Sequence, residues 1–325
     1  MLSDEKILIT GPAGQIAFPL TRYLAADNEV WGIARFSEDG SRERVDALGV
    51  TTRVVDLAVG DYSDVPDDFT LVLHLATFQA PGQDYDWALR VNAEGTGRLL
   101  AHTHRARAAL VMSTFSVYSR NEDPFHAFAE TDPLGDCRQV HSPTYTVSKI
   151  AEEAVARTAA RALDLPLVIA RMNAAYGPNG GLPGYQLDWM MAGQPIALRA
   201  PGPTPYSPIH QNDINAQVEA MLSVASVPAT IVNWAGDEAV AAEDWCAYLA
   251  QLADAKPRYE HVEHPTASRG GVSDNTRRLE LIGPCSVTWR DGMRDMFESR
   301  YPGGVASGEL AAAAERLRSA VSDRE

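Results

Sequence analysis

Short apolar runs alternate with helical patterns over the first two hundred residues of the chain. Two of these runs, Ile7-Leu-Ile9 and Leu71-Val-Leu73, are almost continuously apolar, as expected for parallel strands that helices cover on both faces. The pattern predicts strands at 6–10, 29–34, 51–55, 71–75, 109–112 and 167–170, and helices at about 15–26, 87–106 and 146–162. The alternation predicts an α/β fold, a Rossmann-type doubly wound parallel sheet.

The regular alternation of apolar runs and helical patterns ends after about residue 175. We predict a dinucleotide-binding Rossmann domain over 1–175 and a smaller, mainly substrate-binding C-terminal lobe over 176–325, with some segments returning to the main sheet. Tyr176–Gly184 and Arg199–Pro208 are rich in Gly and Pro and are predicted to be loops. The second contains four prolines, which exclude a regular helix. An Ala-rich segment, Glu309–Val321, is a further helix candidate.

Composition and charge narrow the possible partners. The 325 residues are 45% hydrophobic, and 28 Lys and Arg against 43 Asp and Glu give a net charge of −15. That charge disfavours nucleic acid and anionic membranes, and no apolar run reaches the roughly 18 residues of a membrane span. Cys137, Cys246 and Cys285 lack disulfide or metal-site spacing, so buried thiols, no metal and a cytoplasmic location are expected. The N-terminus has no signal-peptide pattern. With nucleic acid and membranes disfavoured, we expect the partner to be a small-molecule substrate.

Candidate chemistry lies in the segment Tyr145-Thr-Val-Ser-Lys149. On a helix, a spacing of four residues places the phenol and the ammonium on one face. A nearby cation favours the phenolate form of a tyrosine. Such a pair can exchange a proton with a secondary alcohol or a carbonyl.

A glycine-rich turn, Thr10-Gly11-Pro-Ala-Gly14-Gln-Ile-Ala17, follows the first predicted strand and opens the first helix. Glycines allow a tight turn and a close approach of the backbone to a pyrophosphate, which the helix N-terminus favours. The alternative is a simple strand–helix turn. Its place after the first strand of a βαβ unit favours dinucleotide binding.

The end of the second strand bears on the choice of cofactor. NAD sites usually carry Asp or Glu about 20 residues past the glycines, on the ribose hydroxyl. Here Ala34 and Arg35 stand in that region, and an arginine can pair with a 2′-phosphate. We therefore favour NADP over NAD. Glu38 and Asp39 keep NAD as the alternative, and Arg35 is otherwise a solvated surface residue.

With these segments together, the chain resembles the extended short-chain dehydrogenase/reductases, the NAD(P)-dependent epimerase/dehydratase family. The resemblance runs from about Lys6 to about Arg300. Further segments that carry it are Asp56-Leu57, His74-Leu-Ala76-Thr77, Asn92 in Val91-Asn-Ala-Glu-Gly-Thr96, Met112-Ser-Thr-Phe-Ser-Val-Tyr118, Arg171-Met-Asn-Ala-Ala-Tyr-Gly-Pro178 and Pro208-Ile-His210-Gln-Asn-Asp213.

The resemblance implies that Tyr145 exchanges the proton with the substrate. It implies that Lys149 favours the phenolate form of Tyr145 and holds the nicotinamide ribose, and that Thr114 hydrogen-bonds the reacting oxygen. Ser113 and Ser116 are alternatives to Thr114, which otherwise caps a strand end. The predicted cofactor-binding residues are Gly11, Ala13, Gly14, Gln15, Ile16, Arg35, Asp56, Leu57, Leu75, Ala76, Thr77, Asn92, Ser113, Tyr145, Lys149, Met172 and Ala174. The predicted substrate-binding residues are Ser116, Asn173, Tyr185, Tyr206 and Arg269.

Departures from the family pattern narrow the chemistry. Phe115-Ser116 follow Thr114 where sugar 4,6-dehydratases carry Asp-Glu, which disfavours water elimination. Tyr206 stands where nucleotide-sugar epimerases usually have an arginine, which argues against a nucleoside diphosphate substrate. Arg269 resembles a second phosphate-binding arginine, and a local structural role for it is as good an explanation.

A long acidic and aromatic insert, 120–142, separates Thr114 from Tyr145. Long loops in compact domains often form lids. With Trp87, Tyr185 and Trp189 this insert is a candidate wall of an apolar substrate pocket, although these aromatic residues are equally suited to a core.

The leading interpretation is an NAD(P)-dependent oxidoreductase that transfers a hydride at a secondary alcohol or carbonyl. A nucleotide-sugar epimerase with retained NAD is the second hypothesis. The third, of another class, is a non-catalytic NADP-sensing regulator. Many family members form homodimers through the helix that carries Tyr-x-x-x-Lys. The apolar positions of 146–162 fit such a dimer and fit burial within one chain equally well.

Overall fold

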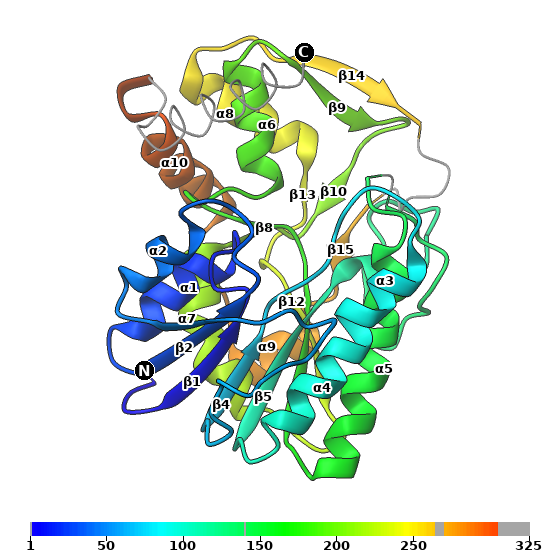
Figure 1. The fold of residues 1–325 in the computed structure, drawn as a ribbon. Coiled ribbons are helices and arrows are strands. Elements are labelled where there is room, and N and C mark those ends of the chain that lie inside the picture. Colours follow the sequence, from blue (N-terminus) through cyan, green and yellow to red (C-terminus); the bar gives the residue numbers. More distant parts are fainter. Residues whose placement is uncertain (1, 140, 264–269, 305–325) are drawn as a thin grey trace.

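The computed structural model of the chain describes residues 2–139, 141–263 and 270–304 (Figure 1). Its centre is a parallel sheet of seven strands in the order β12-β7-β5-β4-β1-β2-β3. The strands are β1 (Lys6–Thr10), β2 (Glu29–Ala34), β3 (Thr51–Val54), β4 (Leu71–His74), β5 (Ala108–Thr114), β7 (Leu167–Met172) and β12 (Thr230–Trp234). The predicted doubly wound sheet is confirmed.

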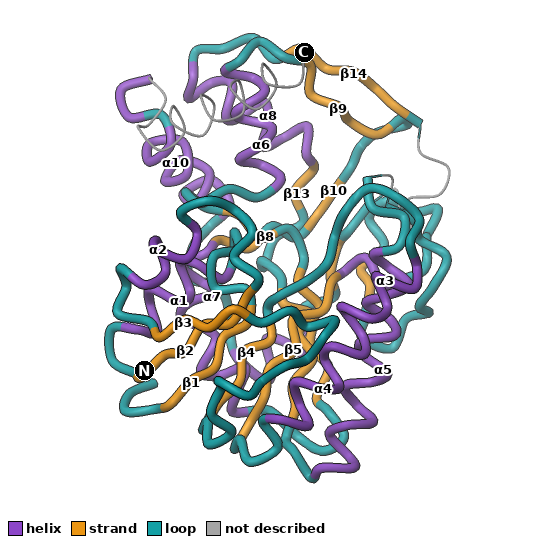
Figure 2. The backbone as a smooth tube through the Cα atoms, viewed as in Figure 1, coloured by secondary structure: helices purple, strands orange, loops and turns teal. Residues whose placement is uncertain are grey.

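Helices cover both faces of this sheet (Figure 2). One face carries α1 (Ala17–Ala25), α2 (Ser41–Asp46), α7 (Gln211–Ser223) and α9 (Thr276–Ile282). The other carries α3 (Tyr85–Leu89), a π-helical turn (Arg90–Glu94), α4 (Gly95–His102) and α5 (Tyr145–Leu163). Alternate strand residues face opposite cores: Ile7 and Ile9 pack with Leu20 on the first side, and Leu8 packs with Leu99 on the second. Burial on both faces explains why these strands are apolar throughout.

A second group of elements packs above the carboxyl ends of the strands (Figure 1). It contains α6 (Leu182–Met191), α8 (Ala242–Ala253), α10 (Trp289–Arg300) and the parallel pair β9 (Pro195–Arg199) and β14 (Arg258–Val262). Its own core includes Leu187, Trp245 and Met293. Short pairs complete the structure: β8 (Ala175–Tyr176) with β11 (Ile209–His210), β10 (Pro205–Tyr206) with β13 (Val240–Ala241), and β6 (Ala127–Phe128) with β15 (Val272–Ser273). Two 3₁₀ turns lie at Phe115–Val117 and Pro302–Gly304.

Several predicted boundaries differ from the structure. The seventh strand, β12, was not predicted, although Thr230-Ile-Val-Asn-Trp is a strand-like run. The predicted loop 176–184 is wrong at its end, because 182–184 form the first turn of α6. A proline is tolerated there, at Pro183, since its missing N–H has no helical partner in the first turn. The single helix expected over 87–106 is three helical pieces that end at His102. The helix candidate 309–321 lies outside the described residues.

No helix in the described part of the chain is both long and apolar enough to cross a bilayer.

A buried ion pair ties helix α5 to the sheet. The Arg171 guanidinium donates to both carboxylate oxygens of Glu153, at 2.9 and 2.8 Å, and to the carbonyl of Glu130 at 3.0 Å. Its carbon Cζ lies 4.9 Å from the Tyr118 ring centroid. Arg171 is 2% exposed and Glu153 4%. The pair therefore fixes α5, β7 and the 120–142 insert relative to one another.

We expect Arg171→Met to lower the free energy of unfolding by about 3–5 kcal/mol, because it leaves the Glu153 carboxylate buried without its partner. Urea denaturation followed by circular dichroism measures the loss. Arg105→Met is the matched control, since the Arg105–Asp67 pair is 63% and 46% exposed and should contribute less than about 1 kcal/mol. Equal losses in the two variants would contradict this account.

Candidate functional site

One large cavity of about 870 Å³ opens at the carboxyl ends of the central strands. This edge is where open α/β sheets bind ligands, and the volume is in the range of small-molecule and cofactor sites. Its wall contains these predicted residues: Gly11, Ala13, Gly14, Gln15, Ile16, Arg35, Asp56, Leu57, Leu75, Ala76, Thr77, Ser113, Thr114, Ser116, Tyr145, Lys149, Met172, Asn173, Ala174, Tyr185 and Tyr206. Their roles stay predictions, but the structure brings them together.

The glycine-rich turn forms the floor of one end. Gly11 has a φ of +65°, and a Cβ there would lie 3.0 Å from Cα of Ala76. Only glycine fits both the left-handed backbone and this close approach. The Gly14 N–H donates to the Gly11 carbonyl at 2.9 Å, and α1 begins three residues later at Ala17. The turn thus presents backbone and a helix N-terminus to the cavity, as a pyrophosphate requires.

Polar groups without protein partners line the same end. The Gln15 Nε2 and Ser41 Oγ atoms are buried and have no hydrogen-bond partner among the described residues. Both residues belong to the wall of the cavity. Buried polar groups in proteins are nearly always paired, so unpaired ones on residues of a cavity wall fit a site that a polar ligand completes. The donor set and the glycine turn therefore fit a dinucleotide.

Arg35 also faces this end, at the point where β2 stops. Among the described residues it has no ion-pair partner. The neighbouring arginines are engaged: Arg44 donates to the Ala13 carbonyl at 3.0 Å and packs on Phe18, and Arg42 donates to the Thr52 hydroxyl at 2.9 Å. Arg35 is the guanidinium in this group that is left for a ligand.

The chemical end of the cavity combines three side chains from two elements. Thr114 ends β5, and its Oγ1 accepts from the Ser116 N–H at 3.2 Å. An accepting hydroxyl keeps its own proton for donation, so Thr114 can donate to an oxygen in the cavity. Tyr145 begins α5, and its hydroxyl has no partner within the described part of the chain. Lys149 lies one turn further along the same helix.

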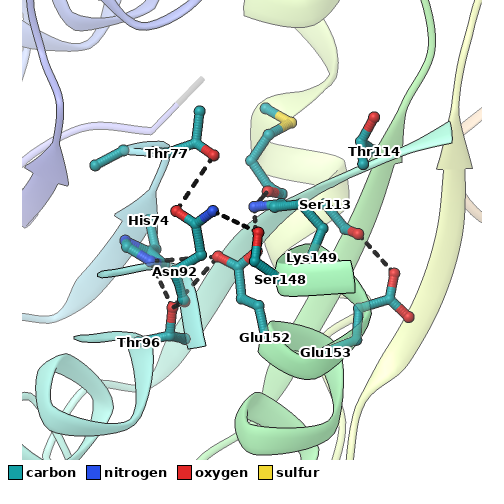
Figure 3. Close-up of polar contacts among 12 residues, drawn as sticks. His74, Thr77, Asn92, Thr96, Ser113, Thr114, Ser148, Lys149, Glu152 and Glu153 are labelled. Atoms are coloured by element: carbon teal, nitrogen blue, oxygen red, sulfur yellow. Dashed lines mark hydrogen bonds and ion pairs between the residues drawn. The ribbon is translucent and has the colours of Figure 1, made fainter. Parts of the chain in front are cut away.

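The Lys149 ammonium is 1% exposed and is held from behind (Figure 3). Its Nζ donates to the Met112 carbonyl at 2.8 Å and forms an ion pair with Glu152. The hydrogen bond to Met112 uses one of its three protons, whereas the contact with Glu152 is a pairing of charges, since Oε2 of Glu152 has no hydrogen-bond partner among the described residues. The ammonium can therefore also donate into the cavity that Lys149 lines.

Asn92 lies behind the cavity wall rather than in it. It is 1% exposed, its Oδ1 accepts from the Phe78 N–H at 2.6 Å, and its Nδ2 donates to the Ser148 hydroxyl at 2.9 Å. Asn92 therefore joins the loop after β4 to α5 (Figure 3). It positions the segment around Thr77 and does not itself line the cavity, and its predicted contact with the cofactor stays a prediction.

Ser113 lines the cavity, but its hydroxyl donates to Glu153 at 2.6 Å. This bond directs the Ser113 proton away from the reacting end. The alternative that Ser113 replaces Thr114 is therefore disfavoured by the geometry. The second alternative, Ser116, accepts from Gln139 Nε2 at 2.7 Å and keeps its own proton.

The far end of the cavity is lined by Tyr206, Arg199 and Gly271. The Tyr206 ring packs 5.5 Å from Trp245. Burial raises the pKa of the Tyr206 phenol, and the nearby Arg199 guanidinium opposes that shift. Asn173 is committed to structure, because its Nδ2 donates to the Gly271 carbonyl at 2.7 Å. Arg269 lies outside the described residues.

The 120–142 insert contributes to the wall through residues that were not predicted, Cys137 and Gln139. Its aromatic residues do not form an apolar pocket: Phe125 is 50% exposed and Phe128 is 3% exposed in a core. Arg199 was also missed as a site residue. Its signal was its position as the first residue of the proline-rich loop, which also carries the lining residue Tyr206.

The comparisons with known proteins agree with this geometry. Residues 7–199, more than half of the chain, match the model of the NAD dependent epimerase/dehydratase family. The chain belongs to this family. No curated protein sequence matches it significantly.

Solved structures of family members share the fold. The UDP-glucuronic acid 4-epimerase from Bacillus cereus, in complex with UDP-glucuronic acid and NAD, has a TM-score of 0.79 and 21% identity over 90% of this chain and 98% of its own. MoeE5, in complex with UDP-glucose and NAD, has 0.75 and 22% over the same shares. The UDP-glucose 4-epimerase from Thermotoga maritima has 0.77 and 18%, again over 90% and 98%.

We expect Gly11→Ala to weaken NADPH binding at least about tenfold, because the added Cβ is strained and meets Ala76. Titration of nicotinamide fluorescence measures the affinity. Gly49→Ala is the control: Gly49 has a φ of +79° but nothing within 4 Å of an added Cβ, and it does not line the cavity. That variant should lose about 1 kcal/mol of stability and keep its affinity. Unchanged affinity in Gly11→Ala would refute the assignment of the turn.

Proposed function

We propose that this protein is an NAD(P)-dependent enzyme that transfers a hydride at a secondary alcohol or carbonyl, with Tyr145 as its acid/base. The observation that carries the proposal is the placement of two uncommitted hydroxyls, Thr114 and Tyr145, in one cavity wall with the Lys149 ammonium behind them. Family membership and the glycine turn supply the place for the cofactor.

In the oxidative direction, the Tyr145 phenolate accepts the proton of the substrate hydroxyl while the adjacent carbon loses its hydrogen as hydride. The Thr114 hydroxyl donates to the reacting oxygen and orients it. The Lys149 ammonium would stabilise the phenolate and would donate to a ribose hydroxyl of the bound cofactor. A nicotinamide bound at this site supplies hydride acceptance or donation. Reduction of a carbonyl is the reverse, with Tyr145 donating the proton.

We favour NADP as the cofactor. Arg35 faces the cavity without an ion-pair partner among the described residues, and the Ser41 hydroxyl nearby is unpaired. Together they suit a 2′-phosphate, which carries two negative charges and strong acceptor oxygens. Glu38 also lines this end and keeps NAD as the alternative, as does the NAD in the solved structures of relatives.

A nucleotide-sugar epimerase with retained NAD is the second candidate. It is favoured by the structural relatives, which are described as UDP-sugar 4-epimerases, and by Arg199, a cation at the far end of the cavity. Arg199 supplies a positive charge close to Tyr206, which is the position where nucleotide-sugar epimerases usually carry an arginine. An epimerase returns the hydride to its substrate, so it isomerises without net consumption of cofactor. A regulator that binds NADP without turnover is the remaining hypothesis.

A homodimer in a cytoplasmic setting is part of the proposal. Val147 on α5 is 48% exposed, which leaves an apolar residue on the helix that would pair two copies. The three cysteines are free thiols, as a reducing compartment allows. Light scattering after size exclusion gives the mass of the assembly, and a monomeric mass would remove the dimer from the proposal.

Tyr145→Phe should reduce turnover about 10³-fold while NADPH affinity stays within about twofold, because only the transferred proton is lost. The assay follows NADPH oxidation with a panel of ketones and aldehydes, and product formation from UDP-sugars. Tyr259→Phe is the control, since Tyr259 of β14 is 40% exposed and does not line the cavity. Wild-type turnover in Tyr145→Phe would exclude the mechanism.

Arg35→Ala should weaken NADPH binding about tenfold to a hundredfold and leave NADH binding unchanged, because a charge-assisted bond to the 2′-phosphate is lost. Parallel fluorescence titrations with NADPH and NADH measure both affinities in the same protein. An equal effect on the two cofactors, or none on either, would contradict NADP preference.

A further inference from the structure

A connected set of buried polar groups lies behind Lys149, on the side away from the cavity (Figure 3). Glu152, three residues after Lys149 on α5, is 0% exposed and forms an ion pair with the ammonium. Its other oxygen, Oε1, accepts from the Thr96 hydroxyl at 3.3 Å and lies 3.4 Å from Nε2 of His74. Neither Glu152 nor His74 takes part in the mechanism proposed above.

The hydrogen bonds of this set have one consistent direction. The Thr10 hydroxyl oxygen accepts from the backbone N–H groups of Leu75 and Ala76, at 3.0 and 2.9 Å, which fills both of its lone pairs. Its proton therefore goes to Nδ1 of His74, 2.8 Å away. Nε2 of His74 then carries the ring hydrogen and donates it to the Thr96 hydroxyl, 2.8 Å away, with Oε1 of Glu152 at 3.4 Å. The Thr96 hydroxyl has the Asn92 carbonyl at 2.5 Å and Oε1 of Glu152 at 3.3 Å, so its one proton goes mainly to the Asn92 carbonyl.

The Glu152 carboxylate thus lies between the Lys149 ammonium, which faces Oε2 as an ion pair, and the Nε2–H of His74, which lies beside Oε1. A carboxylate is acceptor-only when ionised, so the arrangement suits the ionised form. The ammonium needs such a partner, because a lysine removed from water favours its neutral form unless a negative charge faces it.

We propose that Glu152 is a positioning residue for the catalytic lysine: it keeps Lys149 an ammonium and fixes the direction in which that ammonium faces the cavity. His74 and Thr96, through the chain that begins at Thr10, hold Glu152 in place. The inference rests on the proposed function, since it concerns the same lysine, but it makes a separate statement about how the charge of that lysine is maintained.

The charged and polar groups around Lys149 are limited in number. Its own helix carries Tyr145, Glu152 and Glu153. The neighbouring elements present His74 of β4, Thr96 of α4, Asn92 of the π-helical turn and the Met112 carbonyl of β5. Glu153 is taken up by Arg171 of β7 and by Ser113. Within the described part of the chain, Glu152 is thus the carboxylate that is paired with Lys149.

The chain offers a direct readout, because it contains three lysines, Lys6, Lys149 and Lys256. Protein labelled with ¹³C at the lysine side chains gives three signals whose shifts report protonation of each amine. The signal that disappears in Lys149→Met assigns Lys149. The measurement uses the full chain without and with NADPH and needs no substrate, so it is decided separately from the proposed reaction.

In Glu152→Gln we expect the Lys149 signal to titrate at least about one pH unit lower than in the wild type, because the isosteric amide removes the negative charge and keeps the volume. Glu152→Asp, which keeps the charge, should leave the titration within a few tenths of a unit of the wild type. Lys6 and Lys256 serve as internal references in each spectrum. A Lys149 titration that is unchanged in Glu152→Gln, or shifted equally in both variants, would overturn the proposal.

Glu152→Gln leaves an unpaired buried group and is examined with saturating NADPH, which stabilises the folded state. Should it still not fold, Glu152→Asp decides through turnover. The shortened carboxylate draws Lys149 back, so kcat should fall about tenfold while the titration of Lys149 is retained. Unchanged kcat in folded Glu152→Asp would overturn the positioning role. Absence of turnover in the wild-type protein would instead contradict the proposed function, and the titration of Lys149 would still test the pairing with Glu152.

Discussion

The burial of charge between helix α5 and the central sheet is the constraint on which this site depends. Lys149, Glu152 and Glu153 are all nearly inaccessible to solvent, at 1, 0 and 4% exposure, and lie on one helix. A buried charge without a partner costs several kcal/mol, so each must meet its complement. Arg171 of β7 complements Glu153, and Lys149 and Glu152 complement each other, with His74 of β4 beside Glu152. These contacts fix the rotation of α5 about its axis.

That rotation determines the chemistry. Because Glu153 faces Arg171 and Glu152 faces His74, Lys149 is directed along the carboxyl end of β5, and Tyr145 is carried to the cavity one turn earlier. The same polar network that holds the helix therefore places Tyr145, the proposed acid/base. Catalytic groups must be held within narrow limits by the residues around them, and here the supporting residues belong to the rigid sheet and helices rather than to loops.

The spacing of Tyr145 and Lys149 and the glycine turn were predictable, because local periodicity and turn chemistry carry them. The six strands of the first two hundred residues were predictable for the same reason. The seventh strand, β12, was not, because it follows a stretch of irregular elements and joins the sheet through long-range pairing with β7. The sequence could not predict which hydroxyls lack a protein partner either. The hydrogen bond from Ser113 to Glu153, for example, joins residues 40 positions apart.

The sequence argument placed Asn92 at the cofactor, and the structure places it behind the wall, where it joins a loop to α5. Glu152 and Arg199 were not considered at all. Nothing local distinguishes a glutamate three residues after a lysine from an ordinary solvated helix pair. Only the packing of α5 against β4 and α4 shows that its carboxylate is buried, and only the fold shows that Arg199 reaches the cavity.

The two ends of the cavity are complementary to different chemical groups of a ligand. The glycine turn, Gln15 and Arg35 suit phosphates and a ribose, whereas the far end joins Tyr206 to the Arg199 guanidinium. The ends are linked by Thr114, Tyr145 and Lys149, so a ligand that fills both must present its reacting carbon between them. This geometry is shared by enzymes that release their reduced cofactor and by those that retain it.

The central claim is that this cavity is a nicotinamide site. Its most direct measurement is the stoichiometry of nicotinamide binding to the purified wild-type protein. One part of the sample is unfolded and assayed for cofactor that co-purified. The other part stays folded and is titrated with NADPH and with NADH by calorimetry. The account predicts one nicotinamide per chain, either co-purified or bound in the titration. A folded protein that carries no cofactor and shows saturable binding of neither nucleotide would contradict it.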